Sequence, residues 1–294
     1  MKTFLTITLL GCAMGLQPAQ AQTPVGSAAD LRAKHDALQP QLRQNPFQKP
    51  IHLVSTEAGN AVSGDVFAVV AAPFEQAAPA LAQAESWCEI LLLQFNVKQC
   101  RAAAQDDTAA LEVRVARKPE QSAEQAYKVA FNYRVEARAP DYLRVRLNAA
   151  QGPVGTRDYR ILLEAAPLAD GRTFVRLFYA YALGGTGKLA MQFYLGGSGA
   201  DKVGFTPAGG AGGQDLVGGM RGVIERNTMR YYLAVEAFLG ALGNPPAARF
   251  DKAARDWFAG TERYKRQLWE MEQGTYLAMK RREYQAQAQL QARR

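Results

Sequence analysis

The amino-acid sequence predicts an α+β fold, in which a curved antiparallel sheet wraps on one long helix near the C-terminal end of the domain. Between residues 131 and 195, short segments alternate apolar and polar residues, as half-buried antiparallel strands do. Apolar residues then repeat at helical spacing from Leu216 to Leu242. The 294 residues are 48% hydrophobic, which is enough apolar surface for a packed domain.

Residues 1–21 have the pattern of a signal peptide. Lys2 precedes an apolar stretch, and small residues end it at Ala21, where we expect cleavage. This predicts a periplasmic or secreted protein. An alternative is a lipoprotein modified at Cys12, because the preceding residues resemble a lipobox, although Leu10 is bulkier than usual there.

Residues 22–50 are expected to form an N-terminal leader helix. Ser27 and Asp30 form a capping-box-like start, and Pro50 lies beyond the end. Its apolar side is marked by Leu31, Leu38 and Leu42.

The domain proper is expected to begin with two strands, a helix and a further strand. Residues 51–55 and 65–71 are short and rich in β-branched residues. From Phe74 to Trp87 apolar residues repeat at helical spacing, and a strand is expected at residues 91–97.

An antiparallel meander is expected to follow. Its predicted strands are residues 111–115, 131–136, 143–147, 159–163, 175–181 and 189–195. The glycines at 184–187 are interpreted as a hairpin loop, because the neighbouring residues do not complete a phosphate-binding loop. The glycine-rich residues 196–213 are interpreted as a mobile flap or a flexible connector.

Cys88 and Cys100 are the cysteines that remain after removal of the signal peptide. An even pair in an oxidising compartment favours a disulfide. Two buried free thiols are the alternative, and the spacing differs from that of a C-x-x-C redox pair.

The element order and the segments at residues 64–75 and 87–91 (GDVFAVVAAPFE and WCEIL) carry a family resemblance. Over about residues 51–243 the chain resembles the helix-grip superfamily, also called START-like or SRPBCC. Its members include lipid-transfer domains, polyketide cyclases and the birch pollen allergen family. The resemblance implies a cavity between sheet and long helix that holds an apolar or amphipathic small molecule, with no obligate cofactor.

Six residues are candidates for binding a ligand in such a cavity. Tyrosine combines an apolar ring with a polar tip, which suits an amphipathic ligand. The candidates are Tyr133, Tyr159, Tyr179, Tyr181, Asn227 and Tyr231. The alternatives are that the tyrosines are ordinary core or surface residues, and that Asn227 bonds a backbone group or a buried water.

Catalytic and metal sites are poorly supported by the sequence. The two histidines, His35 and His52, precede the predicted cavity elements, and the H-E-x-x-H and G-x-S-x-G motifs are missing. We therefore predict no catalytic residue, metal or cofactor. A cyclase-like enzyme that uses Glu225 or Tyr159 is a less favoured alternative.

Residues 244–294 are predicted to form a basic amphipathic helical extension. From residue 249 onwards it has 11 Lys and Arg against 6 Asp and Glu, most of the chain's surplus of +8. Its apolar side includes Trp257, Tyr264, Leu268 and Met271. Such a helix contacts anionic lipid or a partner, or packs back on its own domain. Nucleic acid is not an expected partner of an exported protein.

Together these patterns predict an exported protein that binds a hydrophobic small molecule, a lipid or lipid-like compound. The alternative is an envelope interaction module that docks a partner or membrane through its basic C-terminal helix.

Overall fold

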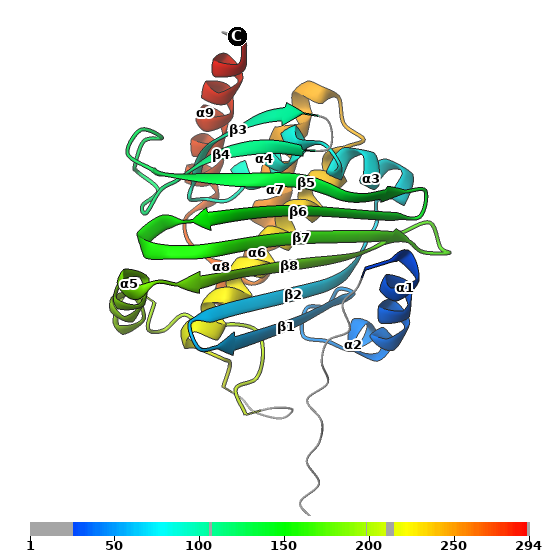
Figure 1. Cartoon of the computed structure of the whole chain (residues 1–294), viewed down its shortest axis with the longest axis horizontal. Coiled ribbons are helices and arrows are strands. Elements are labelled where there is room, and N and C mark those ends of the chain that lie inside the picture. Colours follow the sequence, from blue (N-terminus) through cyan, green and yellow to red (C-terminus); the bar gives the residue numbers. More distant parts are fainter. Residues whose placement is uncertain (1–25, 106–107, 198, 210–214, 293–294) are drawn as a thin grey trace, which may run out of the picture.

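The computed structural model describes residues 26–292 except 106–107, 198 and 210–214, so the predicted signal peptide and Cys12 lie outside the described residues. Its centre is one antiparallel sheet with the strand order β1-β2-β8-β7-β6-β5-β4-β3 (Figure 1). The strands are β1 (Ile51–Ala58), β2 (Ala61–Val70), β3 (Val97–Gln105), β4 (Thr108–Val115), β5 (Tyr127–Ala139), β6 (Tyr142–Gln151), β7 (Thr156–Pro167) and β8 (Thr173–Leu183). Strands β3 to β8 thus form a continuous meander, and the β1–β2 hairpin extends the sheet by pairing β2 with β8.

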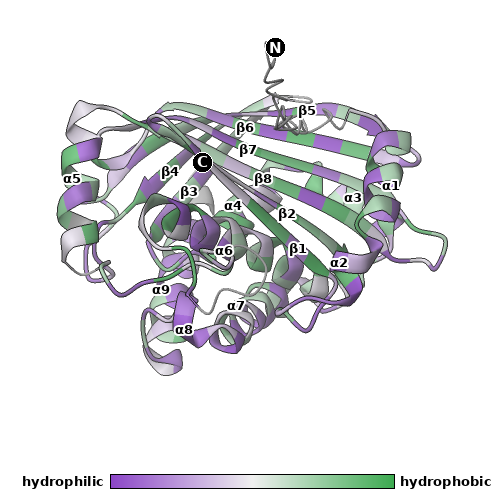
Figure 2. Ribbon diagram, turned by 90° about the horizontal axis from the view of Figure 1, so that it is seen from below, coloured by the Kyte–Doolittle hydropathy of each residue, from purple (hydrophilic) through white to green (hydrophobic). Residues whose placement is uncertain are grey.

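Most of the helices lie on one side of this curved sheet (Figure 2). They are α4 (Ala84–Leu92), α6 (Gly219–Ala241), α7 (Pro246–Arg263), α8 (Lys265–Leu268) and α9 (Gln273–Ala292). The short helix α5 (Gly185–Gly196) lies at one end of the sheet, and α3 (Phe74–Leu81) lies at the other. The predicted α+β helix-grip architecture is confirmed, with α6 as the long helix and α7–α9 as the extra helices.

The leader packs on the opposite face of the sheet. It forms α1 (Ala28–Ala37) and α2 (Gln39–Arg43), and the Ser27 hydroxyl accepts the Asp30 backbone N–H at 3.1 Å. Leu31, Leu38 and Leu42 are buried against Phe67, Val69 and Phe174 of β2 and β8. The alternation of β2 therefore gives the sheet two apolar faces, one for the leader and one for the core.

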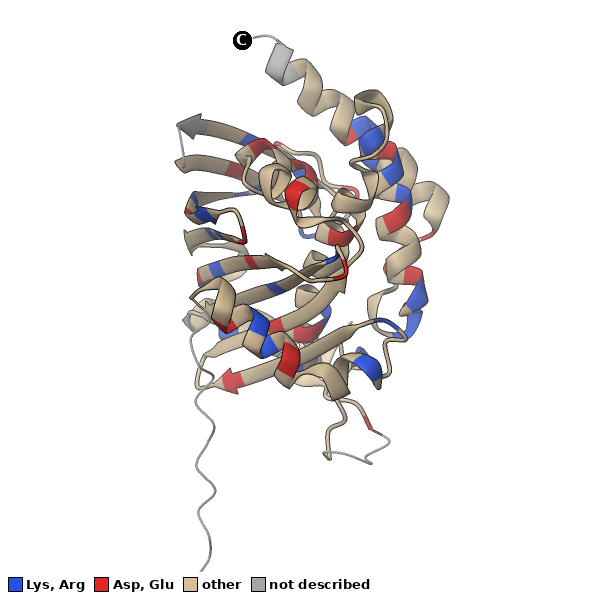
Figure 3. Cartoon of the chain, turned by 90° about the vertical axis from the view of Figure 1, so that its right-hand side faces the viewer, with Lys and Arg blue, Asp and Glu red and all other residues tan. Residues whose placement is uncertain are grey.

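The C-terminal extension folds back on the domain. Helix α9 lies along the outer edge of β3, where the Cys100 backbone N–H donates to Gln287 Oε1 at 2.9 Å and Lys280 Nζ donates to the Val97 carbonyl at 2.8 Å. Trp257 and Leu268, from the predicted apolar side, are buried. Acidic and basic residues are interspersed on the outer side of these helices (Figure 3). None of the described helices is long and apolar enough to cross a membrane.

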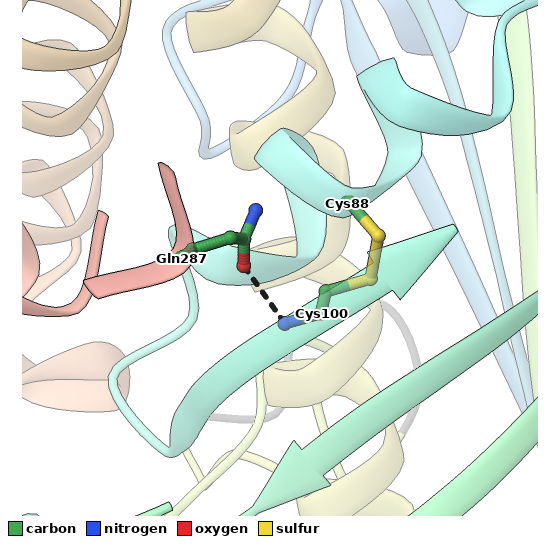
Figure 4. The surroundings of a disulfide bond; sticks show 3 residues. All are labelled: Cys88, Cys100 and Gln287. Atoms are coloured by element: carbon green, nitrogen blue, oxygen red, sulfur yellow. Dashed lines mark hydrogen bonds between the residues drawn. A yellow bond between two sulfur atoms is a disulfide. The ribbon is translucent and has the colours of Figure 1, made fainter. Parts of the chain in front are cut away.

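Cys88 of α4 and Cys100 of β3 form the predicted disulfide (Figure 4). Because the Cys100 backbone N–H also donates to Gln287, the consecutive elements α4 and β3 meet α9, from the far end of the sequence, at this point. The cross-link therefore fixes α4 on β3, beside the edge that α9 covers.

Three predicted elements differ from the structure. Residues 91–97 are not a strand, because α4 continues to Leu92 and β3 begins only at Val97. The predicted helix from Phe74 to Trp87 is two helices, α3 and the first part of α4. Residues 189–195 belong to α5, whose first turn takes the glycines interpreted as a hairpin loop. Short apolar runs are compatible with both a strand and a helix, so their pattern does not choose between them.

Removal of the disulfide should destabilise the protein without changing its fold. A loop of this length contributes about 3 kcal/mol to the free energy of unfolding in the loop-entropy account. We expect the double substitution Cys88→Ala/Cys100→Ala to lower the urea midpoint, and a reductant to lower that of the parent protein to a similar value. Equal urea midpoints for parent and variant under oxidising conditions would show that the cross-link contributes nothing.

Candidate ligand-binding cavity

A cavity of about 720 Å³ lies between the sheet and α6. Its walls come from the concave side of the strands, the α4–β3 connection, the N-terminal half of α6, α5, and the short 3-10 turn η1 (Pro153–Gly155). It reaches the end of the sheet where α5 and the β4–β5 and β6–β7 connections lie (Figure 1). A volume of this size falls in the range of small-molecule sites.

Aromatic side chains form one wall of the cavity. Tyr179 and Tyr181 are two residues apart on β8 and therefore point to the same face. The Tyr159 ring stacks on Tyr181 with centroids 5.4 Å apart, and the Tyr231 ring of α6 lies 4.9 Å from that of Tyr179. Phe131 of β5 meets Tyr159 edge-on. The wall is thus a continuous set of rings from three strands and the closing helix.

An irregularity in β7 places Tyr159 in this wall. The pairing of β7 with β8 shifts register between Arg157 and Arg160, and Asp158 has a positive φ of 57°. Such a bulge turns the side chains beside it. Gly152 leaves the space for the ring, because a Cβ at that position would lie 2.2 Å from Tyr159 Cε2. The Tyr159 hydroxyl donates to Thr156 Oγ1 at 2.7 Å.

Three of the cavity tyrosines, Tyr159, Tyr179 and Tyr231, remain neutral phenols at neutral pH. Burial raises the pKa of Tyr159, of Tyr179 and of Tyr231 above the usual value for tyrosine. A neutral phenol donates and accepts hydrogen bonds, but it does not act as a tyrosinate base. The wall is therefore suited to holding a ligand.

Helix α6 contributes a second wall. Val223, Asn227, Arg230 and Tyr231 follow helical spacing and face the cavity. Asn227 is half-buried, and its side-chain amide has no hydrogen-bond partner among the described residues. It is therefore available to bond a polar group of a ligand.

The remaining part of the lining is polar and lies near the β3–β4 edge. Gln94 and Asn96 precede β3, and Arg117 and Lys118 follow β4. The Ala116 backbone N–H donates to the Asn96 carbonyl at 2.7 Å, which holds the two connections together. Gln94 and Asn96 are not candidates from the sequence because a strand is expected at 91–97, and Arg117 and Lys118 are not because they carry no motif. The helical spacing from Asn227 could have indicated Arg230.

Five of the six predicted residues line the cavity: Tyr159, Tyr179, Tyr181, Asn227 and Tyr231. The sixth, Tyr133, is buried in the packed interior of β5 and is not among the lining residues. Its side chain points to the same face of β5 as that of Phe131, but it lies two residues farther from the end of the sheet that the cavity reaches. That any of these residues binds a ligand stays a prediction.

Glu225, considered from the sequence as a catalytic residue, does not lie in the cavity. It is fully buried on α6 and does not line the cavity. Its carboxylate accepts the Ser55 hydroxyl at 2.6 Å and the backbone N–H groups of Phe205 and Thr206 at 2.6 and 3.0 Å. Glu225 therefore fixes the connection before α6, and this described part of the glycine-rich segment is anchored by specific bonds.

The histidines lie away from the cavity. His35 is on α1, and His52 is on the outer face of β1, beside Phe67. Among the described residues, no three His, Cys, Asp or Glu side chains gather in a way that could hold a metal ion.

Helix α5 and η1 form the rim of the cavity. The Gly184 N–H donates to the Gly155 carbonyl at 2.9 Å, and a Cβ on Gly155, at φ 74°, would lie 2.1 Å from Thr186 Oγ1. A second cavity of about 180 Å³ lies on the other side of α5, between this helix and the β1–β2 turn. Met191 lines both cavities. Helix α5 is thus bordered by empty space on two sides.

No protein-family model and no curated protein sequence matches the chain. Solved structures similar to it include a conserved protein from Geobacillus kaustophilus, at 12% identity over 60% of this chain and 95% of that chain, with a TM-score of 0.37. Human StAR-related lipid transfer protein 5 has 12% identity over 57% and 88%, with a TM-score of 0.31. The Zhui aromatase/cyclase from Streptomyces sp. R1128 has 13% identity over 47% and 73%, with a TM-score of 0.32.

The raised tyrosine pKa values predict a loss of stability at alkaline pH. The folded state favours the neutral phenols, and this contribution to the free energy of unfolding is fully present below the ordinary tyrosine pKa of about 10. It is lost as the pH rises from that value towards the raised pKa values of the folded state. We expect the free energy of unfolding to fall less between pH 9 and pH 11 in Tyr179→Phe than in the parent protein. Urea unfolding across this pH range measures the free energy of unfolding of each protein. The control is Tyr127→Phe, which removes the hydroxyl group of an exposed tyrosine. Identical pH profiles for Tyr179→Phe and the parent protein would contradict this account.

Proposed function

We propose that this protein binds a hydrophobic small molecule, a lipid or lipid-like compound, in the cavity between the sheet and α6. The observation that carries the proposal is a 720 Å³ space whose wall is a continuous set of aromatic rings. Apolar surface in a concave site supplies the binding free energy, and a few polar groups orient the ligand. Asn227 and the tyrosine hydroxyls are the orienting groups in this proposal.

Binding without turnover is the function that the side chains support best. The cavity tyrosines are kept neutral by burial, and the Glu225 carboxylate is occupied by bonds away from the cavity. A cyclase-like reaction is therefore the less supported alternative. Turnover of a cyclisable substrate that is lost in Tyr159→Phe while the fold is kept would favour the enzyme.

We also propose that the protein acts outside the cytoplasm, in the periplasm or as a secreted protein. The support is the signal-peptide pattern at residues 1–21 and a cysteine pair placed to form a disulfide. Lipoprotein processing at Cys12 would leave the protein in the same oxidising environment but attached to a membrane.

The rim of the cavity is the surface that we propose for contact with a lipid membrane. Among the described residues, four of the five strongly exposed large apolar side chains lie at this end of the sheet. They are Tyr127, Val154, Leu189 and Phe193. The C-terminal helices, considered for this role from the sequence, use Trp257 and Leu268 in packing on the domain instead. An apolar rim would let a lipid pass between bilayer and cavity without crossing water.

Filling the cavity should abolish ligand binding. Val223 faces the cavity from α6, so Val223→Trp is expected to weaken binding of the neutral apolar probe N-phenyl-1-naphthylamine at least about tenfold, measured by fluorescence titration of the full chain. The matched control is Val54→Trp, on the outer face of β1, which should bind the probe as the parent does. Equal binding by both variants, or no binding by the parent protein, would contradict the proposed function.

Membrane contact should depend on the rim and not on exposed apolar residues elsewhere. We expect Leu189→Ser/Phe193→Ser to reduce co-flotation with phosphatidylcholine vesicles containing phosphatidylglycerol several-fold, because the two side chains are 56% and 74% exposed. Trp269→Ser, at the fifth exposed apolar side chain, is the control and should float like the parent. Equal loss in the control and the rim variant would remove the support for a specific contact.

A further inference from the structure

The charged residues that line the cavity are all of one sign. Arg117, Lys118 and Arg230 are among its lining residues, and no aspartate or glutamate is among them. Glu120 and Glu124 belong to the same β4–β5 connection as the first two cations, but they do not line the cavity. A concave surface with cations alone concentrates a positive potential inside it.

We infer that the ligand is an anionic amphipath whose carboxylate or phosphate group lies at the corner formed by Arg117, Lys118 and Arg230. This inference rests on the proposed function and narrows its ligand class. Charge-assisted hydrogen bonds from arginine and lysine to such groups are roughly twice as strong as neutral ones. A neutral lipid of the same shape would leave the exposed side chains of Arg117 and Lys118 without a counter-charge.

The three cations come from two segments, the β4–β5 loop and α6, each of which contacts the α4–β3 connection. Arg117 and Lys118 directly follow Ala116, which is bonded to Asn96 in the α4–β3 connection. Gln94, in the same connection, donates through Nε2 to the Arg230 carbonyl at 3.1 Å, and the Arg230 guanidinium lies 5.3 Å from the centre of the Phe95 ring. The α4–β3 connection therefore joins the β4–β5 loop to α6 and places the cations around one corner.

The positive charge of this corner is not cancelled by Glu270, the acidic residue that pairs with Arg230. Arg230 donates to Glu270 outside the cavity, but Glu270 also receives both hydrogen bonds from Lys202, so one carboxylate is shared by two cations. Arg117 and Lys118 are exposed and form no ion pair within the described residues. They are therefore available to an incoming anion.

The hydrocarbon part of such a ligand has a separate place. The aromatic wall of Tyr159, Tyr179 and Tyr181 lies on the central strands β7 and β8, whereas the cationic corner lies at the β3–β4 edge. Because burial raises the pKa of Tyr159 and Tyr179, these two phenols stay neutral and offer rings and hydroxyl groups without competing for the anion. The cavity thus divides into an end for a charged group and a wall for an apolar chain.

The test compares ligands that share one chain and differ only in the head group. Oleate, oleyl phosphate, oleyl alcohol and oleylamine are titrated into the full chain below their aggregation concentrations by calorimetry. We expect oleate or oleyl phosphate, or both, to bind at least about tenfold more tightly than the alcohol, and oleylamine to bind most weakly. The ratio of the affinities for oleate and oleyl phosphate shows which acid group the corner prefers. Inorganic phosphate alone should bind far more weakly than oleyl phosphate.

Variants identify the residues responsible. Arg117→Gln/Lys118→Gln should remove most of the preference for the anion, because it should weaken the binding of oleate and oleyl phosphate much more than that of oleyl alcohol. Arg43→Gln/Arg282→Gln removes the same charge from exposed positions outside the cavity and should keep the preference. Raised salt should reduce the preference in the parent protein, because the two loop cations are exposed to solvent.

Two results would overturn the inference while the proposed function stands. One is equal affinity of the parent protein for oleate, oleyl phosphate and oleyl alcohol. The other is an equal loss of acid and alcohol binding in the Arg117/Lys118 variant, which would mean that these residues only support the fold. If none of the four compounds binds, both the inference and the proposed function fail.

Discussion

The rest of the structure depends on one geometric constraint: a single helix cannot cover a curved sheet of eight strands. Helix α6 contacts β1, β2 and β8, and α4 with α9 packs at β3 and β4. The concave face of β5–β7 lies between these two contact zones. Side chains from both zones fill this space at one end, and at the other end it remains as the cavity. The cavity therefore lies over the part of the sheet that the helices leave uncovered.

The two terminal extensions protect sheet surfaces that the central fold leaves open. The leader covers the convex face with three leucines, and α9 lies along β3, whose outer backbone groups would otherwise be unpaired. An uncovered edge strand is a template for pairing with other chains. The basic character of the C-terminal extension is a property of its outer surface, whereas its apolar side belongs to the core.

The sequence predicted the architecture because two periodicities are clear in it. Alternation marks β5 and β6, where one face is buried, and the apolar stripe of α6 is long enough to leave no alternative. It failed where a short apolar run has no such context, at residues 91–97 and 189–195. The alternation of apolar and polar residues also shows which face of the sheet a side chain occupies, but not how far along the strand it lies from the cavity. The sequence therefore could not show that Phe131 lines the cavity and Tyr133 does not.

The cationic corner could not have been predicted, because its residues are brought together by contacts between connections. Arg117 and Lys118 follow a strand end and carry no motif, and their proximity to Arg230 depends on the α4–β3 connection. Tyr159, in contrast, was predicted on the basis of its residue type, but its orientation depends on a register shift. Residue type can suggest a role in binding, whereas long-range pairing decides which residues meet.

The two cavities on either side of α5 bear on the timing of ligand exchange. A segment with empty space on both sides and glycines at both ends opens at a smaller free-energy cost than the packed sheet and α6. Opening of α5 would widen access to the aromatic wall without disturbing the rings. The residence time of a ligand would then depend on α5, whereas its equilibrium affinity would depend on the walls of the cavity. Substitutions in α5 would change the exchange rate and leave the affinity unchanged.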